Sequence, residues 1–343
     1  MNSLNAHRPV PAGSPPARRA APRSLTLVVP VFNEAEAVPH FVRRISDLFA
    51  SPAEGPAIEM LFVNDGSQDS TLEELLSLQR LDPRIRIVDL SRNFGKEAAL
   101  SAGLDVARGD VVVPIDVDLQ DPPELIAEMI DKWRDGYDVV AAKRASRNAD
   151  SWAKRITAGW FYRIHNQISD IDIPENVGDF RLMDRSVVEA LRQMPESRRF
   201  MKGIFAWMGF RTATVEYARP ERVAGTSKFN GWKLWNFALE GTTSFSTVPL
   251  RIWTYIGGSV ALLSIGFALY TVVKVLIFGI DVPGYASIVV AISLLGGLQL
   301  MGIGVLGEYL GRTYMESKRR PVFLIRTIYE GAPADAVANE SRP

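Results

Sequence analysis

Short, continuous apolar runs alternate with stretches of helical spacing in the first half of the chain. A continuous apolar run is typical of a strand that is covered on both faces, whereas apolar residues at every third or fourth position indicate a helix. The pattern predicts strands at residues 25–31, 58–63, 85–90, 111–115 and 137–142. It predicts helices at residues 35–50, 71–80, 96–107 and 122–133. Alternating strands and helices imply right-handed crossovers, so we expect an α/β domain with a Rossmann-like, mostly parallel sheet.

Polar residues directly follow four of the predicted strands. They are Asn33-Glu34, Asn64-Asp65, Ser91-Arg92-Asn93 and Asp116-Val117-Asp118. Ligands of parallel α/β sheets bind beyond the carboxyl ends of the strands, where these four clusters are expected to meet. Asp116 and Asp118 end a buried strand, and buried carboxylates are costly without a partner. A divalent cation that carries a phosphate-rich ligand is the simplest partner, since oxygen ligands suit Mg²⁺ or Mn²⁺.

Composition and missing motifs narrow the function classes. Lys+Arg and Asp+Glu both number 39, so the net charge is zero and gives no general attraction for nucleic acid. The chain has no cysteine, which excludes disulfides, thiolate metal sites and a cysteine nucleophile. No glycine-rich dinucleotide motif follows the first strand, and no P-loop is present. The two aspartates can also be read as solvated turn residues, but four polar clusters at one sheet edge favour a shared ligand site.

Two much longer apolar runs follow in the last third of the chain. They cover residues 252–280, interrupted only by Lys274, and residues 285–306. About 20 apolar residues are enough to cross a bilayer, so we predict a hairpin of two transmembrane helices. Two buried helices of a soluble core are the alternative. The turn between the runs has no Lys or Arg, whereas Arg251 precedes the first and a basic cluster at 318–320 follows the second, so the positive-inside rule puts both flanks in the cytoplasm.

Cations and aromatic residues are interleaved in two segments between the predicted sheet and the hairpin. The first is a predicted helix at residues 151–167, and the second covers residues 229–250. Each can be a solvated face over a core, but the combined pattern suits helices that lie at a membrane surface. At the other end of the chain, residues 1–23 are rich in Pro, Ala and Arg and contain no acid, which predicts a disordered basic tail.

Three motifs, in this order, resemble the inverting glycosyltransferase family 2, which has the GT-A fold. They are Val29-Pro30-Val31-Phe32-Asn33-Glu34, Asn64-Asp65-Gly66-Ser67-Gln68-Asp69 and Asp116-Val117-Asp118-Leu119-Gln120-Asp121-Pro122-Pro123-Glu124. Within that family, the chain resembles the polyprenyl-phosphate glycosyltransferases. This group contains dolichol-phosphate mannose synthase and the bacterial GtrB-like and ArnC-like enzymes. The resemblance extends from residue 25 to residue 328.

The resemblance implies roles for particular residues. The nucleotide-sugar donor would contact Pro30, Phe32, Glu34, Asp65, Asp116, Val117, Asp118, Gln120, Arg222 and Lys228. A Mg²⁺ or Mn²⁺ cofactor would be held by Asp116, Asp118 and Gln120. The acceptor phosphate would contact Arg144, Arg147 and Arg155. The groups at the reaction centre would be Asp118, Asp179 and Arg144.

Asp179 lies in the segment 178–182, which resembles the family's segment beneath the donor sugar. A carboxylate there can act as a general base, or it can orient the sugar or the acceptor. A phosphomonoester has a second pKa of about 6, so a phosphate acceptor is mostly dianionic and already nucleophilic at neutral pH. We therefore expect Asp179 to orient its ligands more than to remove a proton.

The predicted organisation is a cytoplasmic GT-A domain at residues 24–228, an interfacial helix at 229–250, two transmembrane helices at 251–311 and a cytoplasmic C-terminal segment and tail at 312–343.

The predicted reaction is metal-dependent, inverting transfer of one sugar from a nucleotide donor to undecaprenyl phosphate at the bacterial inner membrane. UDP-glucose is the preferred donor by resemblance, with GDP-mannose, UDP-GlcNAc or a modified pentose left open. A Gln-x-x-Arg-Trp motif, as in processive synthases, is absent, which favours single-sugar transfer.

Two functions of other classes remain as alternatives at this stage. One is a non-catalytic membrane adaptor that binds sugar nucleotides, and the other is a small transporter subunit. Retention of both Asp116 and Asp118 argues against the adaptor. Two spans without an intramembrane acid or a broken helix make a poor transport path. Glycines in the second span favour close helix packing, so we also expect a homo-oligomer, a dimer or a tetramer.

Overall fold

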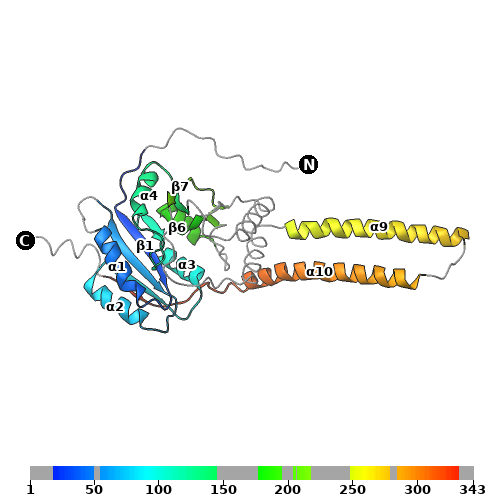
Figure 1. Ribbon diagram of the computed structural model, residues 1–343, viewed down its shortest axis with the longest axis horizontal. Coiled ribbons are helices and arrows are strands. Elements are labelled where there is room, and N and C mark those ends of the chain that lie inside the picture. Colours follow the sequence, from blue (N-terminus) through cyan, green and yellow to red (C-terminus); the bar gives the residue numbers. More distant parts are fainter. Residues whose placement is uncertain are drawn as a thin grey trace, which may run out of the picture. The chain divides into compact units, whose positions relative to one another are not determined.

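The computed structural model describes residues 18–49, 55–144, 177–194, 204–205, 207–217, 248–278 and 284–331 (Figure 1). The chain divides into two compact units. The described part of the first unit runs from residue 18 to residue 217 and resumes at residue 321. The described part of the second unit covers residues 248–278 and 284–320.

The first unit is built on a sheet in which the described residues form eight strands, in the order β7-β5-β6-β4-β1-β2-β3-β8. Their bounds are β1 Ser24–Val31, β2 Ala57–Asn64, β3 Ile85–Leu90, β4 Val111–Pro114, β5 Val139–Arg144, β6 Val177–Asp184, β7 Thr212–Tyr217 and β8 Ile325–Tyr329. The neighbours β4, β1, β2 and β3 are mutually parallel, as are β5 and β7. This confirms the predicted α/β, mostly parallel sheet.

Two strands run against this direction, and the sequence pattern did not predict either position. β6 inserts antiparallel between β4 and β5, so the strand expected at residues 137–142 is not a neighbour of β4. β8 pairs antiparallel with β3 at the opposite edge. It lies within residues 312–343, which the sequence analysis described only as a C-terminal segment and tail.

Helices cover both faces of the sheet, which explains why most residues of the central strands are buried and apolar (Figure 1). They are α1 Ala37–Leu48, α2 Thr71–Leu81, α3 Lys96–Val106, α4 Leu125–Arg134 and α6 Arg185–Arg192. α1 buries Phe41 and Ile45 in one core cluster with Leu27 and Val29 of β1. α3 packs tightly on the sheet at Gly103, where a Cβ atom would lie 2.3 Å from Val28 Cγ1.

The second unit contains two long helices that lie side by side, α9 Val248–Phe278 and α10 Tyr285–Ser317 (Figure 1). Gly302 of α10 faces the ring of Trp253 of α9, and a Cβ atom there would lie 3.6 Å from Trp253 Cε3. Both helices expose many large apolar side chains, among them Leu262, Leu263, Phe267, Leu276, Leu300, Leu306 and Leu310. Counted over the described residues alone, no helix meets the length and hydropathy required of a membrane span.

Residues 18–23, which the sequence analysis assigned to a basic tail, lie against the first unit. The backbone N–H of Arg19 donates to the carbonyl of Arg134 at 2.6 Å, and its guanidinium donates to Asp138 at 2.6 Å. The guanidinium carbon of Arg19 also lies 5.2 Å from the ring centroid of Trp133. The described part of this predicted tail is therefore packed on the sheet domain, which contradicts the expected disorder for residues 18–23, and residues 1–17 lie outside the described residues.

Candidate active site

The loops after β1 and β2 are joined by hydrogen bonds at the carboxyl edge of the sheet. The N–H of Asn33 donates to Ser67 Oγ at 3.0 Å, and Asn33 Oδ1 accepts from the N–H of Gln68 at 2.8 Å. Asn33 has a φ of 55°, a conformation that asparagine adopts more readily than most residues. The two polar clusters that the sequence pattern placed at neighbouring strand ends thus form one structure.

Asp65 joins these loops to the loop after β3. Its side chain is buried, with Oδ1 accepting from the N–H of Phe94 at 2.7 Å and Oδ2 from the N–H of Gly95 at 2.9 Å. Burial raises the pKa of Asp65, although the two N–H donors act in the opposite direction. Gly66 has a φ of 66°, and a Cβ atom there would lie 2.5 Å from Arg92 C and from Asn93 N, so the close approach of the loops requires glycine.

Asp116 and Asp118 lie on the turn after β4, as predicted, but in different environments. Asp116 is partly buried and Asp118 is exposed, where its Oδ1 accepts from the N–H of Gln120 at 3.1 Å. Val117 between them packs into the hydrophobic core and anchors the turn. The turn is completed by Leu119 with a φ of 54°. Burial raises the pKa of Asp116.

Lys96, at the first position of α3, joins Asp116 to Asp179. Its Nζ lies 2.7 Å from Asp116 Oδ1 and 2.8 Å from Asp116 Oδ2, and 3.4 Å from Asp179 Oδ2. Burial alone would lower the pKa of Lys96, but the carboxylates of Asp116 and Asp179 outweigh burial and raise it. The structure therefore brings Asp179 of β6 to the same cluster as the aspartates after β4.

The sequence analysis did not include Lys96 among the site residues. The sequence did show that Lys96 begins a predicted helix and closely follows the polar residues 91–93 at the end of a predicted strand. That signal is weak, because a lysine at such a position is more often solvated.

The residues present fit a divalent cation that is shared with phosphates. Among the described residues no group of three or more His, Cys, Asp or Glu side chains could hold a metal ion. Mg²⁺, however, commonly uses only one or two carboxylates together with substrate phosphates, and the Asp116 and Asp118 pair meets that need. Burial, followed by the charges of Asp118, Asp69 and Asp116, raises the pKa of Glu34, which indicates a concentrated negative field at this edge.

Asp121 also lies in the loop after β4, and sequence reasoning gave it no role of its own. It is buried, and its Oδ1 accepts a hydrogen bond from the hydroxyl of Tyr217 at the end of β7. A buried carboxylate with a hydroxyl donor is satisfied locally, so Asp121 fixes the turn. This contact links the turn after β4 to the far edge of the sheet.

Several predicted site residues lie outside the described part of the chain. They are Arg147, Arg155, Arg222 and Lys228, together with the predicted interfacial segment 151–167 and the predicted segment 229–250 except for its last three residues, which belong to α9. Arg144 ends β5, but the structure does not describe its side chain. Of the predicted base and ribose contacts, Pro30 lies in β1 and Phe32 follows it with 42% of its surface exposed. The roles of all these residues remain predictions.

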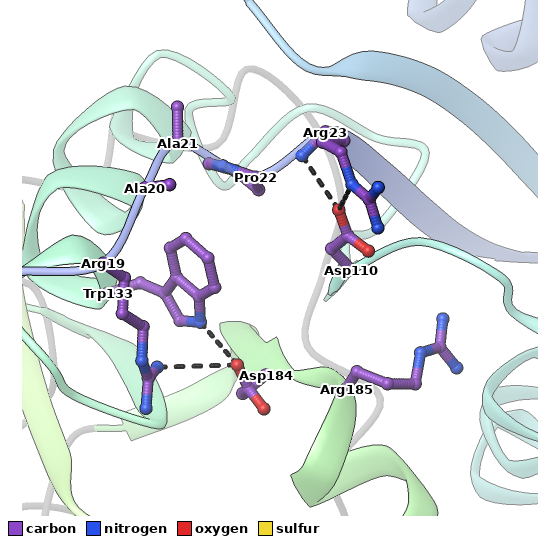
Figure 2. A pocket seen from close by; sticks show the side chains of 9 residues that line it. All are labelled: Arg19, Ala20, Ala21, Pro22, Arg23, Asp110, Trp133, Asp184 and Arg185. Atoms are coloured by element: carbon purple, nitrogen blue, oxygen red, sulfur yellow. Dashed lines mark hydrogen bonds and ion pairs between the residues drawn. The ribbon is translucent and has the colours of Figure 1, made fainter.

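A separate hollow of about 420 Å³ lies at the amino ends of β1 and β4 (Figure 2). It is lined by Arg19, Ala20, Ala21, Pro22, Arg23, Asp110, Trp133, Asp184 and Arg185. Its acids are paired within the lining, because Asp184 accepts from Trp133 Nε1 at 2.8 Å and Asp110 accepts from the N–H of Arg23 at 2.9 Å (Figure 2). The hollow contains no predicted site residue and lies at the opposite strand ends from Asp116.

The chain belongs to glycosyl transferase family 2, and it is a glycosyltransferase. The profile of that family, described as Glycosyl transferase family 2, matches residues 26–192. The chain is 55% identical to the SfII prophage-derived bactoprenol glucosyl transferase of Shigella flexneri, over 90% of this chain and 99% of the relative. It is 54% identical to the prophage bactoprenol glucosyl transferase homolog of Escherichia coli K12, over 89% and 99% of the two chains.

Two further similar proteins say less about the function of this chain. An uncharacterized glycosyltransferase of Synechocystis is 51% identical over 89% of this chain and 95% of its own. Among solved structures, a mannosyltransferase from Pyrobaculum calidifontis in complex with GDP-Man and Mn²⁺ is 18% identical over 90% of this chain and 86% of its own, with a TM-score of 0.45. That likeness is too distant to inform the site.

Proposed function

We propose that the protein transfers one glucose residue from UDP-glucose to undecaprenyl phosphate, with inversion at the anomeric carbon. The observation that carries the proposal is the 54–56% identity, over nearly the full length of each relative, to proteins named bactoprenol glucosyl transferases or a homolog of one. The cluster of acids at the carboxyl edge of the sheet supplies the chemistry that such a transfer needs. The particular base of the donor is proposed from the sequence resemblance.

The donor nucleotide fits the joined loops after β1, β2 and β3. Asp65 is fixed by two backbone N–H groups, and each carboxylate oxygen can still accept from a base or a ribose hydroxyl. Phe32 exposes 42% of its surface beside these loops and offers an aromatic face on which a base can stack. We assign Pro30, Phe32, Glu34 and Asp65 to the nucleoside.

The leaving diphosphate fits the turn after β4. Asp116, Asp118 and Gln120 would hold Mg²⁺ or Mn²⁺, which supplies Lewis-acid stabilisation of the charge that builds on the diphosphate. The ammonium of Lys96 contacts Asp116 and Asp179, and so keeps both acids close without mutual repulsion. Arg222 and Lys228 are proposed as further diphosphate contacts.

The acceptor phosphate attacks the anomeric carbon in line. Its oxygen forms the new bond while the bond from that carbon to the diphosphate oxygen breaks, so the configuration inverts. The dianionic phosphate carries no proton that must be removed, which leaves Asp179 to orient sugar hydroxyls. Arg144, Arg147 and Arg155 are proposed to bind the acceptor phosphate, since guanidinium groups match phosphate oxygens in pairs.

We further propose that α9 and α10 form a transmembrane hairpin in the bacterial inner membrane, with the catalytic unit in the cytoplasm. Residues 252–273 and 285–307 contain no Asp, Glu, Lys or Arg. Large apolar side chains are exposed along both helices, which favours a lipid environment over water. The glycines of α10 would allow close packing in a homo-oligomer, a dimer or a tetramer.

A transfer assay tests the proposed function. The full chain, in detergent or nanodiscs, is incubated with radiolabelled UDP-glucose, undecaprenyl phosphate and Mg²⁺ or Mn²⁺, and the label in the organic phase is counted. We expect a metal-dependent glycolipid that is lost in Asp118→Ala. GDP-mannose, UDP-GlcNAc and a modified pentose donor are tested in parallel, and a faster rate with one of them would correct the donor. No glycolipid with any donor would contradict the proposal.

A further inference from the structure

Arg326 of β8 reaches a buried acid behind the loops of the donor site. Its Nη1 lies 3.3 Å from Asp89 Oδ2, and its Nη2 donates to the carbonyl of Ser91 at 2.7 Å. The Asp89 side chain is only 2% exposed, whereas that of Arg326 is 60% exposed. A surface cation from the last strand of the sheet thus neutralises a buried carboxylate at the end of β3.

Asp89 also connects Arg326 to the loop after β2, through a second hydrogen bond. Its other oxygen, Oδ1, accepts from Asn64 Nδ2 at 2.7 Å, in a buried hydrogen bond. The bond fixes the orientation of the Asn64 amide, so that Asn64 Oδ1 faces the N–H of Ser67, which donates to it at 3.2 Å. Ser67 Oγ in turn accepts from the N–H of Asn33.

β8 also holds the loop after β3 through its backbone. The N–H of Ser91 donates to the carbonyl of Leu324 at 2.9 Å, one residue before β8 begins. The loop that starts at Ser91 continues to Phe94 and Gly95, whose N–H groups bind Asp65. Two chains of contacts therefore run from β8 to the loops assigned to the nucleoside, one through Asp89 and one through Ser91.

We propose that Arg326 is a positioning residue for the nucleotide part of the donor, acting through Asp89 and Asn64. The inference rests on the proposed function, because it takes the loops after β1 and β2 as the nucleoside site. Without Arg326, the buried carboxylate of Asp89 would keep its hydrogen bond from Asn64 but lose its cation, and a buried charge that loses its partner rearranges its surroundings. The aspartates after β4 do not take part in this network.

The kinetics of Arg326→Met distinguish a role in positioning the nucleotide from a general structural role. A hydrogen bond to a charged group contributes on the order of tenfold to an equilibrium, so we expect the KM for UDP-glucose to rise about five- to twentyfold with kcat within about twofold of wild type. The Kd for UDP, measured by calorimetry, should weaken by a similar factor. Arg326→Lys keeps the charge but cannot reach both oxygen partners in the same way, and should give an intermediate KM.

Arg108→Ala is the matched control. Arg108 Nη2 donates to Glu330 Oε1 at 3.1 Å, directly after β8, and this contact lies outside the network of Arg326, Asp89 and Asn64. The Arg108→Ala substitution therefore removes a cation from the same edge of the sheet and leaves the contacts of Arg326, Asp89 and Asn64 intact. Its KM should stay at the wild-type value. Asp89→Asn combined with Arg326→Met should raise KM no further than Arg326→Met alone, since both act through one contact.

Each outcome decides the inference. An unchanged KM and UDP affinity in Arg326→Met would overturn it, and so would an equal rise in Arg108→Ala, which would mean that any loosening of β8 suffices. If Arg326→Met fails to fold by circular dichroism, Arg326→Lys decides: a wild-type KM contradicts the inference and a raised KM supports it. If the wild-type protein makes no glycolipid, the proposed function fails, and the UDP titrations still test the positioning role.

Discussion

Lys96 is the residue that most changes the interpretation of the site. Its partners Asp116 and Asp179 come from two strands that are distant in sequence, and its ammonium lies within 3.4 Å of both. Besides burial, the charge of Asp179 acts to raise the pKa of Asp116, whereas the ammonium of Lys96 acts to lower it. Lys96 therefore offsets part of the negative charge that Asp116 and Asp179 bring to this edge of the sheet.

Lys96→Met should lower kcat by about 100- to 1,000-fold, the range found when one preorganised electrostatic contact is lost at a reaction centre. The donor KM should change less, because the nucleoside loops do not use Lys96. The rate of glycolipid formation measures both. Lys132→Met on α4 is the control and should behave as wild type, and a wild-type kcat in Lys96→Met would show that the contact has no catalytic role.

Asp179→Asn tests whether the acid at the reaction centre removes a proton. The amide keeps the size and most of the hydrogen-bonding capacity of the carboxylate, so we expect kcat to stay within about tenfold of wild type. The measurement is kcat across pH 6 to 9, where an orienting role predicts a profile of unchanged shape. A loss of several orders of magnitude would instead establish an essential base.

At the scale of elements, Asp184 joins β6 to α6 and to the start of the chain. It caps α6 by accepting from the N–H of Ser186 at 2.9 Å, and it accepts from Trp133 Nε1 at 2.8 Å. Burial acts to raise its pKa, but the donors Ser186 and Trp133 and the charge of Arg19 outweigh burial and hold the pKa below its ordinary 3.8. A group with a lowered pKa stabilises the folded state above its ordinary pKa, and that contribution is lost as pH falls through the folded-state pKa.

Asp184→Ala should lower the free energy of unfolding by about 2 kcal/mol at pH 7, from the lost cap and the unsatisfied indole N–H. The difference from wild type should shrink as the pH falls below the ordinary pKa of 3.8, and it should be lost as the pH passes through the lower folded-state pKa of Asp184. Denaturant titrations at several pH values measure this. Asp135→Ala, which removes an exposed ion pair with Arg18, is the control and should cost little. A pH-independent difference would contradict the assignment.

The sequence predicted elements well where the pattern is local. β3 was predicted at residues 85–90 and is observed there, and α3 was predicted within one residue, because each element shows its apolar spacing over a few residues. The antiparallel insertion of β6 and the return of β8 were not predicted. Pairing partners of a strand are chosen by distant parts of the chain, and no local pattern records them.

The same limit applies to the candidate site. The aspartates after β4 and the polar clusters after β1 and β2 were predicted because each follows an apolar run directly. Lys96 was missed because its partner Asp179 lies on the inserted strand β6. Arg326 was missed because it lies on β8, a strand that the sequence pattern did not predict, and its acid, Asp89, is a buried residue of β3 far away in sequence.

At the scale of the whole molecule, the two units have opposite surface chemistry. The catalytic unit buries its apolar residues on both faces of a sheet, whereas α9 and α10 expose theirs along their length. A soluble sugar nucleotide and a lipid-linked acceptor meet at a membrane surface, which is where a protein with this division would work. The orientation of α9 and α10 in the membrane therefore tests the proposed transmembrane hairpin directly.

The absence of cysteine makes that orientation measurable with single-cysteine variants. Gly284→Cys puts a thiol at the exposed start of α10, and Ser77→Cys puts one on the exposed side of α2 in the catalytic unit. A membrane-impermeant maleimide applied to intact spheroplasts should label Gly284→Cys, because the turn lacks Lys and Arg and is proposed to face away from the cytoplasm. Ser77→Cys should react only after lysis. Equal labelling of both variants before lysis, or of neither until lysis, would contradict a hairpin that crosses the membrane with its catalytic unit inside.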